Sequence, residues 1–376
     1  MESRSRSLPS NSWKCHDNKF SHTAALAQAM FHELNLSSIC GHLSSLRNDV
    51  PCKISDRFTN GSKNLVIEAV FNDGVVWIAR IRLSRELSAN EVASMESEIY
   101  VMRTIRVRTK VPVPEVYAWG SGTDNVFRAP FILMEGVPGR NFCNDPSFGA
   151  IKYKVLDQMA SIMVQLSLIR FPAIGSFRSN GELAPIVMNG KPTGPFTDAG
   201  DYYLHFVKSF EHRIEEATNE NERNQMLSTS RLYRASAIPH FIRYSGPFPL
   251  THVDFGLHNL LIDDNGNVIS VIDWSNSRAS PWESFAIFPL PLSVVWTKKS
   301  KYPKAKWEQL LADQSFFIEA LKKYEKQFCT DSNVSSLIAS QSVIAAEAFE
   351  ALIYISSQTG RWLSIVEDLI SAESAK

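Results

Sequence analysis

A chain of 376 residues is long enough for one large domain or two ordinary ones, each with its own hydrophobic core. Lys plus Arg equals Asp plus Glu at 39 each, so the zero net charge gives no support for a nucleic acid or an anionic membrane as a partner. The scattered cysteines indicate free thiols in a reducing, cytoplasmic compartment rather than a disulfide framework or a zinc site; they are Cys15, Cys40, Cys52, Cys143 and Cys329.

The first 46 residues contain a polar segment and then two short helical patterns. Residues 1–21 are rich in Ser, Arg and Asn and have little to bury, which predicts disorder. Apolar residues predict a helix over 24–31, and 35–46 is expected to form a second one.

A β-hairpin is predicted next. A Gly-containing loop at 58–64 precedes two apolar runs, 65–71 and 75–82, which an Asp-Gly turn joins. Arg80 and Arg82 are two residues apart on the second strand, so their side chains face the same side of the sheet. A solvated basic edge is the alternative interpretation of this pair.

A helix is expected to follow the hairpin. Ser88 and Glu91 form a capping-box signature, and apolar residues continue from there at helical spacing. Glu96 and Glu98 lie on this helix.

Beyond the helix, the Pro-rich stretch 111–116 predicts a rigid connector. Residues 131–134 then predict a buried strand, which runs into the Gly- and Pro-containing segment 135–140, a candidate hinge. The remainder of the chain is mostly helical in pattern, with helices expected over 151–169, from Tyr202 onwards, over 307–328 and over 336–357. The longest apolar stretch, 286–296, is interrupted by two prolines, so no membrane-spanning segment is expected.

Asp254, Asn259 and Asp273 form a pattern that fits phosphoryl transfer. A hydroxyl that attacks a terminal phosphoryl group needs a carboxylate to accept its proton, and Mg²⁺ needs hard oxygen ligands. Asp254 can supply the first, and Asn259, five residues later, can supply a ligand. A turn at 264–267 is expected to fold the strand that ends at Asp273 back beside Asn259. A His-x-Asp segment with a nearby Asn, or an Ile-Asp-Trp triplet that ends a strand, often occurs by chance. The two together, with a hairpin of the right length between them, favour a catalytic site.

This pattern resembles the aminoglycoside phosphotransferase-like kinases. The likeness is carried by His252, Asp254, Asn259 and the Ile-Asp-Trp triplet around Asp273, at the family's separation, and a phrase at 171–176 looks like fungal members. It implies Asp254 as the catalytic base, Asn259 and Asp273 as Mg²⁺ ligands, and His252 as a buried brace for the loop.

The resemblance also implies a nucleotide site. Arg80 takes the position of the usual lysine that holds the α and β phosphates, with Glu98 as its partner. The 58–64 loop would cover the phosphates through Asn60, Gly61 and Ser62. In the hinge, Met134 would lie behind the adenine ring, and Glu135 and Val137 would supply the hydrogen bonds; these nucleotide-site residues are Arg80, Glu98, Met134, Glu135, Val137, Asn60, Gly61 and Ser62.

Three positions depart from the family's pattern. Arg80 replaces a lysine and is bulkier, Val253 stands where the family usually has Gly, and Ser284 stands where many members have an Asp that helps to fix the catalytic loop. We therefore expect a different brace for that loop.

The expected fold is α+β and two-lobed, like a protein kinase, with a small lobe built on an antiparallel sheet and a mostly helical large lobe. The expected organisation is a disordered segment at 1–21, a nucleotide-binding lobe at 22–134, a hinge at 135–140 and a catalytic and substrate-binding lobe at 141–376.

The expected activity is ATP- and Mg²⁺-dependent phosphorylation of a small-molecule hydroxyl, with GTP left open as the donor. A nucleotide-binding pseudokinase is the alternative. A protein kinase is disfavoured because no Asp-Phe-Gly or Ala-Pro-Glu segment bounds an activation loop.

Overall fold

The structure is a computed structural model that describes residues 8–13, 21–142, 148–188, 191–214, 219–232, 234–235, 238–242, 245–289, 292–293 and 303–340. The chain divides into two compact units, of which unit 1 comprises Met1–Val155 and Leu257–Ser275 and unit 2 comprises Leu156–Gly256 and Asn276–Lys376. None of the helices in the described ranges has the length and apolar composition needed to cross a membrane.

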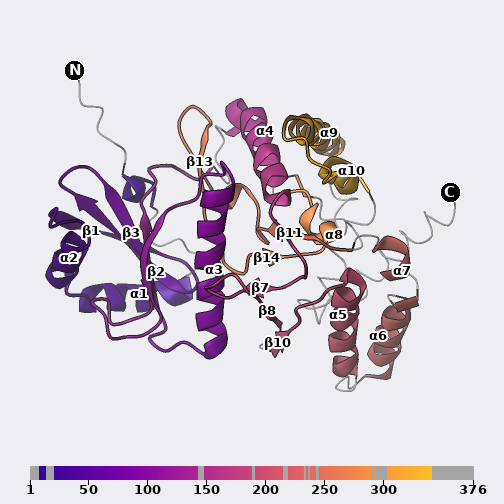
Figure 1. Cartoon of the computed structure of the whole chain (residues 1–376), viewed down its shortest axis with the longest axis horizontal. Coiled ribbons are helices and arrows are strands. Elements are labelled where there is room, and N and C mark those ends of the chain that lie inside the picture. The colour runs from indigo at the N-terminus through magenta and orange to yellow at the C-terminus, as the bar shows by residue number, and fades with distance from the viewer. Residues whose placement is uncertain are drawn as a thin grey trace. The chain divides into compact units, whose positions relative to one another are not determined.

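Unit 1 is built on a five-stranded antiparallel sheet in the order β1-β2-β3-β5-β4. Figure 1 labels the first three of these strands. Its strands are β1 (Cys52–Asn60), β2 (Asn64–Phe71), β3 (Val76–Arg82), β4 (Val116–Gly120) and β5 (Phe131–Glu135). The predicted hairpin is confirmed as β2 and β3, and the predicted strand at 131–134 is confirmed as β5.

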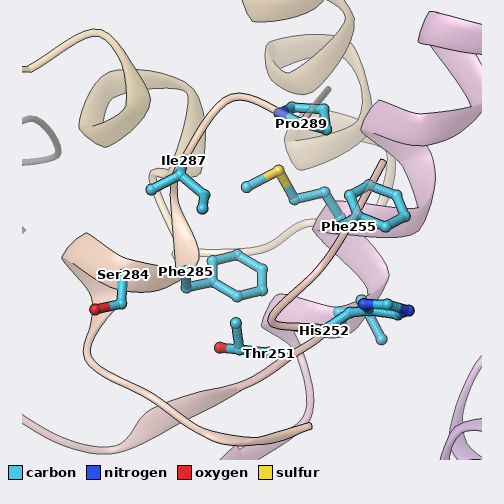
Figure 2. A pocket seen from close by; sticks show the side chains of 9 residues that line it. Thr251, His252, Phe255, Ser284, Phe285, Ile287 and Pro289 are labelled. Atoms are coloured by element: carbon cyan, nitrogen blue, oxygen red, sulfur yellow. The ribbon is translucent and has the colours of Figure 1, made fainter. Parts of the chain in front are cut away.

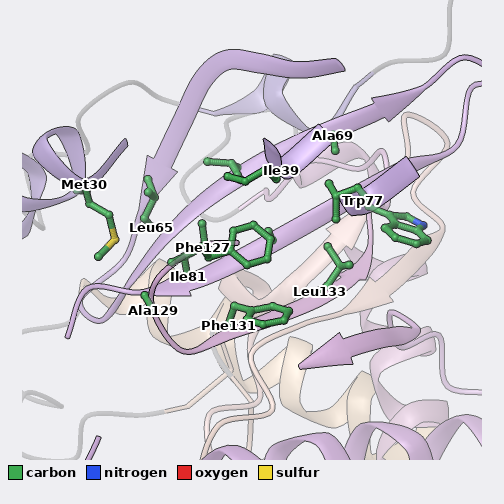
Figure 3. Packing of buried hydrophobic residues seen from close by; sticks show 14 of the residues in the cluster. Met30, Ile39, Leu65, Ala69, Trp77, Ile81, Phe127, Ala129, Phe131 and Leu133 are labelled. Atoms are coloured by element: carbon green, nitrogen blue, oxygen red, sulfur yellow. The ribbon is translucent and has the colours of Figure 1, made fainter. Parts of the chain in front are cut away.

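Strand alternation gives the sheet two different faces. Odd-numbered residues from Leu65 to Phe71 and from Trp77 to Leu83 are buried in one apolar core (Figure 3). The predicted helices α1 (Ser21–Glu33) and α2 (Leu36–Ser45) contribute to that same core, through residues such as Met30 and Ile39. The even-numbered residues, including both arginines of β3, therefore belong to the opposite face.

Helix α3 (Ala89–Arg108) begins where the sequence predicts. The Ser88 hydroxyl accepts a hydrogen bond from the backbone N–H of Glu91, and the Glu91 carboxylate accepts one from the Ser88 N–H, so the capping box is complete. Glu98 is buried on this helix.

Unit 1 also includes the hairpin β12 (Leu260–Ile262) and β13 (Val268–Val271). Its register pairs Leu260 with Val271. The Asp263 carboxylate accepts hydrogen bonds from the backbone N–H groups of Asn265 and Asn267, which closes the turn between the strands. The predicted turn at 264–267 is thereby confirmed.

Unit 2 is mostly helical. Its helices are α4 (Phe148–Ser167, which begins in unit 1), α5 (Ala199–Ile214), α6 (Glu220–Leu232), α7 (Ile238–Phe241), α8 (Trp282–Phe285), α9 (Lys304–Gln327) and α10 (Val334–Ile338). A small sheet, β14-β11-β6, joins Arg278–Ala279, Phe248–Thr251 and Arg170–Phe171. Two ribbons accompany it, β7 (Ser176–Phe177) with β8 (Leu183–Ala184) and β9 (Ile186–Met188) with β10 (Lys191–Thr193).

Most predicted helices of unit 2 are present. Those expected over 151–169, from Tyr202 and over 307–328 correspond to α4, α5 and α9. The helix expected over 336–357 differs in its described part: α10 already ends at Ile338 with Ala339 as its C-cap, and the residues from 341 onwards lie outside the described residues.

Two features of unit 1 differ from expectation. Residues 58–60 end strand β1 instead of forming a loop; the strand's register shifts between Ile54 and Phe58, and this irregular, polar strand has no alternating pattern to reveal it. Of the segment expected to be disordered, residues 1–7 and 14–20 lie outside the described residues, but Pro9–Ser12 forms a short 3₁₀ helix, η1. This 3₁₀ helix is ordered because the side chain of Ser10 is buried in unit 1.

The described cysteines, Cys40, Cys52 and Cys329, are free thiols, while Cys15 and Cys143 lie outside the described residues. Burial and the neighbouring Cys40 raise the pKa of Cys52 to about 12, so its thiol stays protonated at neutral pH.

Candidate active site

The segment that carries His252 and Asp254 follows a buried strand. All four residues of β11 are buried, and the strand pairs with a neighbour on each side. His252 is 5% exposed, and its Nδ1 accepts a hydrogen bond from the backbone N–H of Asp254 at 3.3 Å. Asp254 itself is exposed. The buried imidazole thus fixes the backbone at Asp254 while the carboxylate remains accessible.

The hairpin brings Asn259 and the segment before Asp273 together. The backbone N–H of Ile272 donates to the Asn259 carbonyl at 2.9 Å, so the two ends of the hairpin meet. The side chain of Asn259 is buried, whereas Asp273 is exposed and has a φ of +60°. A positive φ is unfavourable for a non-glycine residue, and such residues concentrate at functional sites.

Arg80 and Glu98 form an ion pair across unit 1. Arg80 Nη1 lies 2.6 Å from Glu98 Oε1, and the side chains are 17% and 3% exposed. The second carboxylate oxygen, Oε2, accepts a hydrogen bond from the hydroxyl of Ser275 at 3.2 Å. Glu98 therefore links the cation of β3 to the segment that follows Asp273.

The protonation of Arg80 reflects these neighbours. Burial acts to lower its pKa, but the charge and hydrogen bond of Glu98, followed by the charge of Asp273, raise the pKa overall. Arg80, Glu98 and Asp273 therefore form one electrostatic group in unit 1. Ser275 is the member of this cluster that the sequence did not reveal, since a serine two residues after an aspartate carries no signal of its own.

Arg82 lies on the same face of β3 but is held differently. Among the described residues its guanidinium forms no hydrogen bond or ion pair, and burial lowers its pKa against the opposing effect of the Glu98 charge. Arg82 pairs with Asn64, the first residue after the β1–β2 loop. This cation therefore sits at the base of that loop.

The loop itself consists of Gly61, Ser62 and Lys63. The side chain of Asn60, the last residue of β1, donates to the Thr23 hydroxyl, which in turn donates to the Gly61 carbonyl. A Cβ built at Gly61 would meet nothing within 4 Å, so the space beside the loop backbone is open.

The candidate hinge presents two backbone groups. The N–H of Glu135 donates to the Glu115 carbonyl, and the carbonyl of Val137 accepts from Gly139. Val137 follows the end of β5, and outside the strand ladders its N–H forms no backbone hydrogen bond within the described residues. Met134 is buried one residue earlier.

Gly139 connects the hinge to the hairpin. A Cβ there would lie 2.8 Å from Ile269 Cδ1 and 2.9 Å from Leu261 Cβ, so only glycine allows this approach. The next residue, Arg140, exchanges two backbone hydrogen bonds with Ile262. The hinge segment is thus fastened to the strand that follows Asn259.

The boundary between the two units falls between Gly256 and Leu257. His252 and Asp254 belong to unit 2, and Asn259, Asp273 and the predicted nucleotide-site residues belong to unit 1. Within unit 1 the structure brings Arg80, Glu98 and the Asp273 segment together. The convergence of Asp254 with Asn259 and Asp273 on a shared cation stays a prediction, based on the short spacing in the sequence, where Asn259 comes five positions after Asp254.

Asn259 and Asp273 fit the chemistry of Mg²⁺. No group of three or more His, Cys, Asp or Glu side chains within the described ranges could hold a metal ion on its own. Mg²⁺ commonly takes one or two protein oxygens and completes its shell with phosphate and water. One amide and one exposed carboxylate match that requirement when a nucleotide supplies the other oxygens.

A mainly apolar cavity in unit 2 is lined in part by Thr251, His252 and Phe255 of the segment around Asp254 (Figure 2). It measures about 20 Å³, room for about one water molecule, and His252, Phe255, Ser284 and Phe285 are among the residues that line it. The Ser284 hydroxyl shares a 2.6 Å hydrogen bond with the hydroxyl of Tyr203 on α5, and both side chains are buried. Tyr203 lies on the helix that the sequence predicts from Tyr202 onwards.

The triplet Asp254-Phe255-Gly256 spells the metal-binding motif of protein kinases, but its position is different. It precedes η4 (Leu257–Asn259) and the β12–β13 hairpin, and therefore stands in the segment that is predicted to be the catalytic loop. It does not bound an activation loop.

A model of the phosphotransferase enzyme family matches residues 57–284, more than half of the chain. The protein belongs to this phosphotransferase family. A curated relative from Ampulloclitocybe clavipes, clavilactone A biosynthesis cluster protein Y, is 23% identical over 283 residues, 69% of this chain and 70% of the relative. A subtelomeric hrmA-associated cluster protein of Aspergillus fumigatus is 32% identical over 96 residues, which are 23% of this chain and 18% of that protein.

Solved structures show the fold of this family member. A protein from Thermobifida fusca named as a fructosamine-3-kinase superposes with a TM-score of 0.52 at 12% identity, over 90% of this chain and 99% of that one. Aminoglycoside phosphotransferase APH(4)-Ia, in a complex with AMP-PNP and hygromycin B, gives 0.50 at 15% identity, over 88% and 98%. The expected α+β, two-lobed, protein-kinase-like fold is thereby confirmed.

Proposed function

We propose that this phosphotransferase uses ATP to phosphorylate a hydroxyl group of a small molecule. The observation that carries the proposal is the cluster of Arg80, Glu98, Ser275 and Asp273 in unit 1. Binding of a metal-bound triphosphate requires a cation for the phosphates and an accessible carboxylate for the metal. Arg80, held by Glu98, and the exposed Asp273 match these two requirements.

In this proposal Asp254 is the general base. It accepts the proton of the acceptor hydroxyl while that oxygen forms a bond to the terminal phosphorus and the bond from phosphorus to the nucleoside diphosphate breaks. His252 holds the loop through its bond to the Asp254 backbone. Because Asp254 is exposed, an acceptor can reach it.

Residues of unit 1 would hold the nucleotide. Asn259 and Asp273 would bind Mg²⁺, which neutralises charge on the phosphate oxygens when bound. Arg80 would contact phosphate, with Arg82 as a second cation whose guanidinium has no partner among the described residues. The Asn60, Gly61 and Ser62 segment would cover the phosphates.

The adenine base of the nucleotide would bind at the hinge. Met134 would lie behind the ring, with Glu135 accepting through its carbonyl and Val137 donating through its N–H. The lobes at 22–134 and 141–376, joined by the hinge at 135–140, are part of this proposal.

A small organic acceptor is supported by the relatives. The Ampulloclitocybe clavipes protein is named for a biosynthesis cluster, and the structural relative APH(4)-Ia was solved with hygromycin B. Free thiols at Cys40, Cys52 and Cys329 support a cytoplasmic location.

The activity is tested by measuring ADP release from ATP and Mg²⁺ across a library of small hydroxyl compounds. With an acceptor in hand, Asp254→Asn is expected to lower kcat by about 10² to 10⁴ with unchanged folding, because the proton acceptor is lost. Asp264→Asn is the matched control, an exposed aspartate of the hairpin turn, and should keep full turnover. Full turnover in Asp254→Asn would contradict its role as base.

The pseudokinase alternative predicts another result. The departures at Arg80, Val253 and Ser284 favour it, but Arg80 is paired with Glu98 and Ser284 is hydrogen-bonded to Tyr203. ATP binding that is equally tight with and without Mg²⁺, together with no turnover on any acceptor, would favour the pseudokinase.

A further inference from the structure

The carboxylate of Glu68 is completely buried in unit 1 and is satisfied by Ser10. The backbone N–H of Ser10 donates to Glu68 Oε2 at 2.9 Å, and the Ser10 hydroxyl donates to Oε1 at 2.7 Å. Arg57 Nη1 also donates to the Ser10 carbonyl at 3.4 Å. The 3₁₀ turn η1, which we call the Pro9–Ser12 turn, is therefore fastened to the sheet by a side chain in β2.

The sheet register locates this contact. Glu68 pairs with Ile78, and Ile78 pairs with Met134, so the three side chains form one row on one face. Arg80 lies two residues beyond Ile78 and faces the same way. The other face is occupied by the core shown in Figure 3. The turn thus binds on the face that carries the proposed phosphate cations.

The order along this face matches a nucleotide. The Glu68 row contains Met134, which we propose to lie behind the base, and the next row contains Arg80, proposed for the phosphates. Two residues along a strand span about 6.6 Å, a distance that fits the step from a base toward its phosphates. The Pro9–Ser12 turn therefore contacts the base-binding row.

A bound nucleoside could replace Ser10 as the hydrogen-bond donor to Glu68. A buried carboxylate beside Ile78 and Met134 is costly unless donors satisfy it, and Ser10 supplies two. Bound nucleosides carry N–H and O–H donors as well. A carboxylate that is satisfied by the chain in the free protein can therefore be satisfied by the ligand after exchange.

We propose that the Pro9–Ser12 turn occupies the base-binding row of the sheet in the free protein and must leave Glu68 before a nucleotide binds. This inference rests on the proposed function, since it takes this face as the nucleotide site. The turn is a self-inhibitory contact that lowers the apparent nucleotide affinity by the fraction of molecules in which it is docked.

The test uses the full chain with Ser10→Glu, which sets a second carboxylate against Glu68 and expels the turn. If the docked state predominates by about tenfold, this variant should bind ATP with Mg²⁺ about tenfold more tightly by calorimetry. Asn11→Glu is the matched control, with the same added charge on an exposed neighbour, and should bind like the unaltered protein. Ser10→Ala, which removes one of the two bonds, should give a smaller gain and serves if Ser10→Glu misfolds.

Hydrogen exchange supplies a second readout. The Ser10 amide should be protected in the free protein and should lose its protection when ATP saturates the site. Equal or weaker ATP binding by both Ser10 variants, or protection that persists with ATP bound, would overturn the inference and leave the proposed function intact. If no variant binds any nucleotide, the inference and the proposed function both fail.

Discussion

At the scale of single residues, the site depends on charges that are buried in compensating sets. Glu98 is almost inaccessible, yet each of its oxygens has a partner, Arg80 on one and Ser275 on the other. A buried carboxylate is tolerated only when it is paired and hydrogen-bonded in this way. The same rule accounts for Glu68 and its two bonds from Ser10.

Removing the Glu98 charge should weaken both folding and nucleotide binding. Glu98→Gln leaves the Arg80 charge without its counterion, and we expect a loss of roughly 2 to 3 kcal/mol, less than for a fully inaccessible pair because Arg80 retains some exposure. The measurement is the urea midpoint at constant m-value. Glu96→Gln on the same helix is the control and should change stability by no more than about 0.5 kcal/mol. Equal midpoints for the two variants would refute the pairing.

The hydrogen bond between Tyr203 and Ser284 is the contact that we assign as the brace replacing the family's aspartate. Tyr203→Phe should destabilise the protein by about 1 to 2 kcal/mol, since it leaves the buried Ser284 hydroxyl without this partner. A double-mutant cycle with Ser284→Ala should yield a coupling energy of about 1 kcal/mol. If the two effects simply add, the bond contributes nothing to folding.

A bracing role makes a further kinetic prediction that simple packing does not. Ser284 and His252 line the same cavity, and His252 holds the Asp254 backbone. Tyr203→Phe should therefore lower kcat while the KM for ATP stays the same. An unchanged kcat would restrict Tyr203 to packing.

At the scale of elements, close approach of backbones holds the proposed nucleotide site together. The hinge pairs with β12 through Arg140 and Ile262, and the N–H of Val271 in β13 donates to the Pro112 carbonyl. The hairpin that carries Asn259 and leads to Asp273 is thus fixed on both strands. This arrangement requires glycine at position 139, because a Cβ there would collide with Ile269 and Leu261 of the hairpin.

Gly139→Ala should therefore disturb the hairpin. The added Cβ would lie under 3 Å from Ile269 and Leu261, and relieving such overpacking costs about 1 to 3 kcal/mol. Thermal unfolding measures the loss. Gly122→Ala provides the comparison, because a Cβ there meets nothing within 4 Å, and its unfolding should match that of the unaltered protein.

At the scale of the whole molecule, the chain alternates between its units. It leaves unit 1 after Val155, returns at Leu257 and leaves again after Ser275, so the motif with Asp254 and Asn259 contains a crossing point. The proposed catalytic function of this motif therefore requires both units to be folded.

The balanced charge should control solubility. With zero net charge near pH 7, repulsion between molecules is minimal, and colloidal solubility should be lowest there. Lowering the pH to about 6 makes the molecule cationic, because histidine is the residue type that ordinarily gains its charge in this range and the chain has nine of them. Raising the pH to about 8 changes fewer charges, because lysines titrate near 10. Turbidity against pH should fall more steeply on the acid side, and a symmetric profile would contradict this account.

The sequence by itself determined the elements that local patterns encode. The capping box at Ser88, the β2–β3 hairpin and the turn around Asp263 depend on contacts within a few residues, so their composition predicted them. The order and spacing of His252, Asp254, Asn259 and Asp273 likewise indicated the family without any knowledge of tertiary contacts.

Only the tertiary structure decided the partners that lie far apart in the chain. Ser275 lies 177 residues from Glu98, Ser284 lies 81 residues from Tyr203, and Ser10 lies 58 residues from Glu68. A serine in any sequence neighbourhood can satisfy a buried oxygen, and which serine does so depends on how the backbone folds around it. Local patterns describe elements, whereas the cost of burying a polar group is settled by the neighbours that folding brings to it.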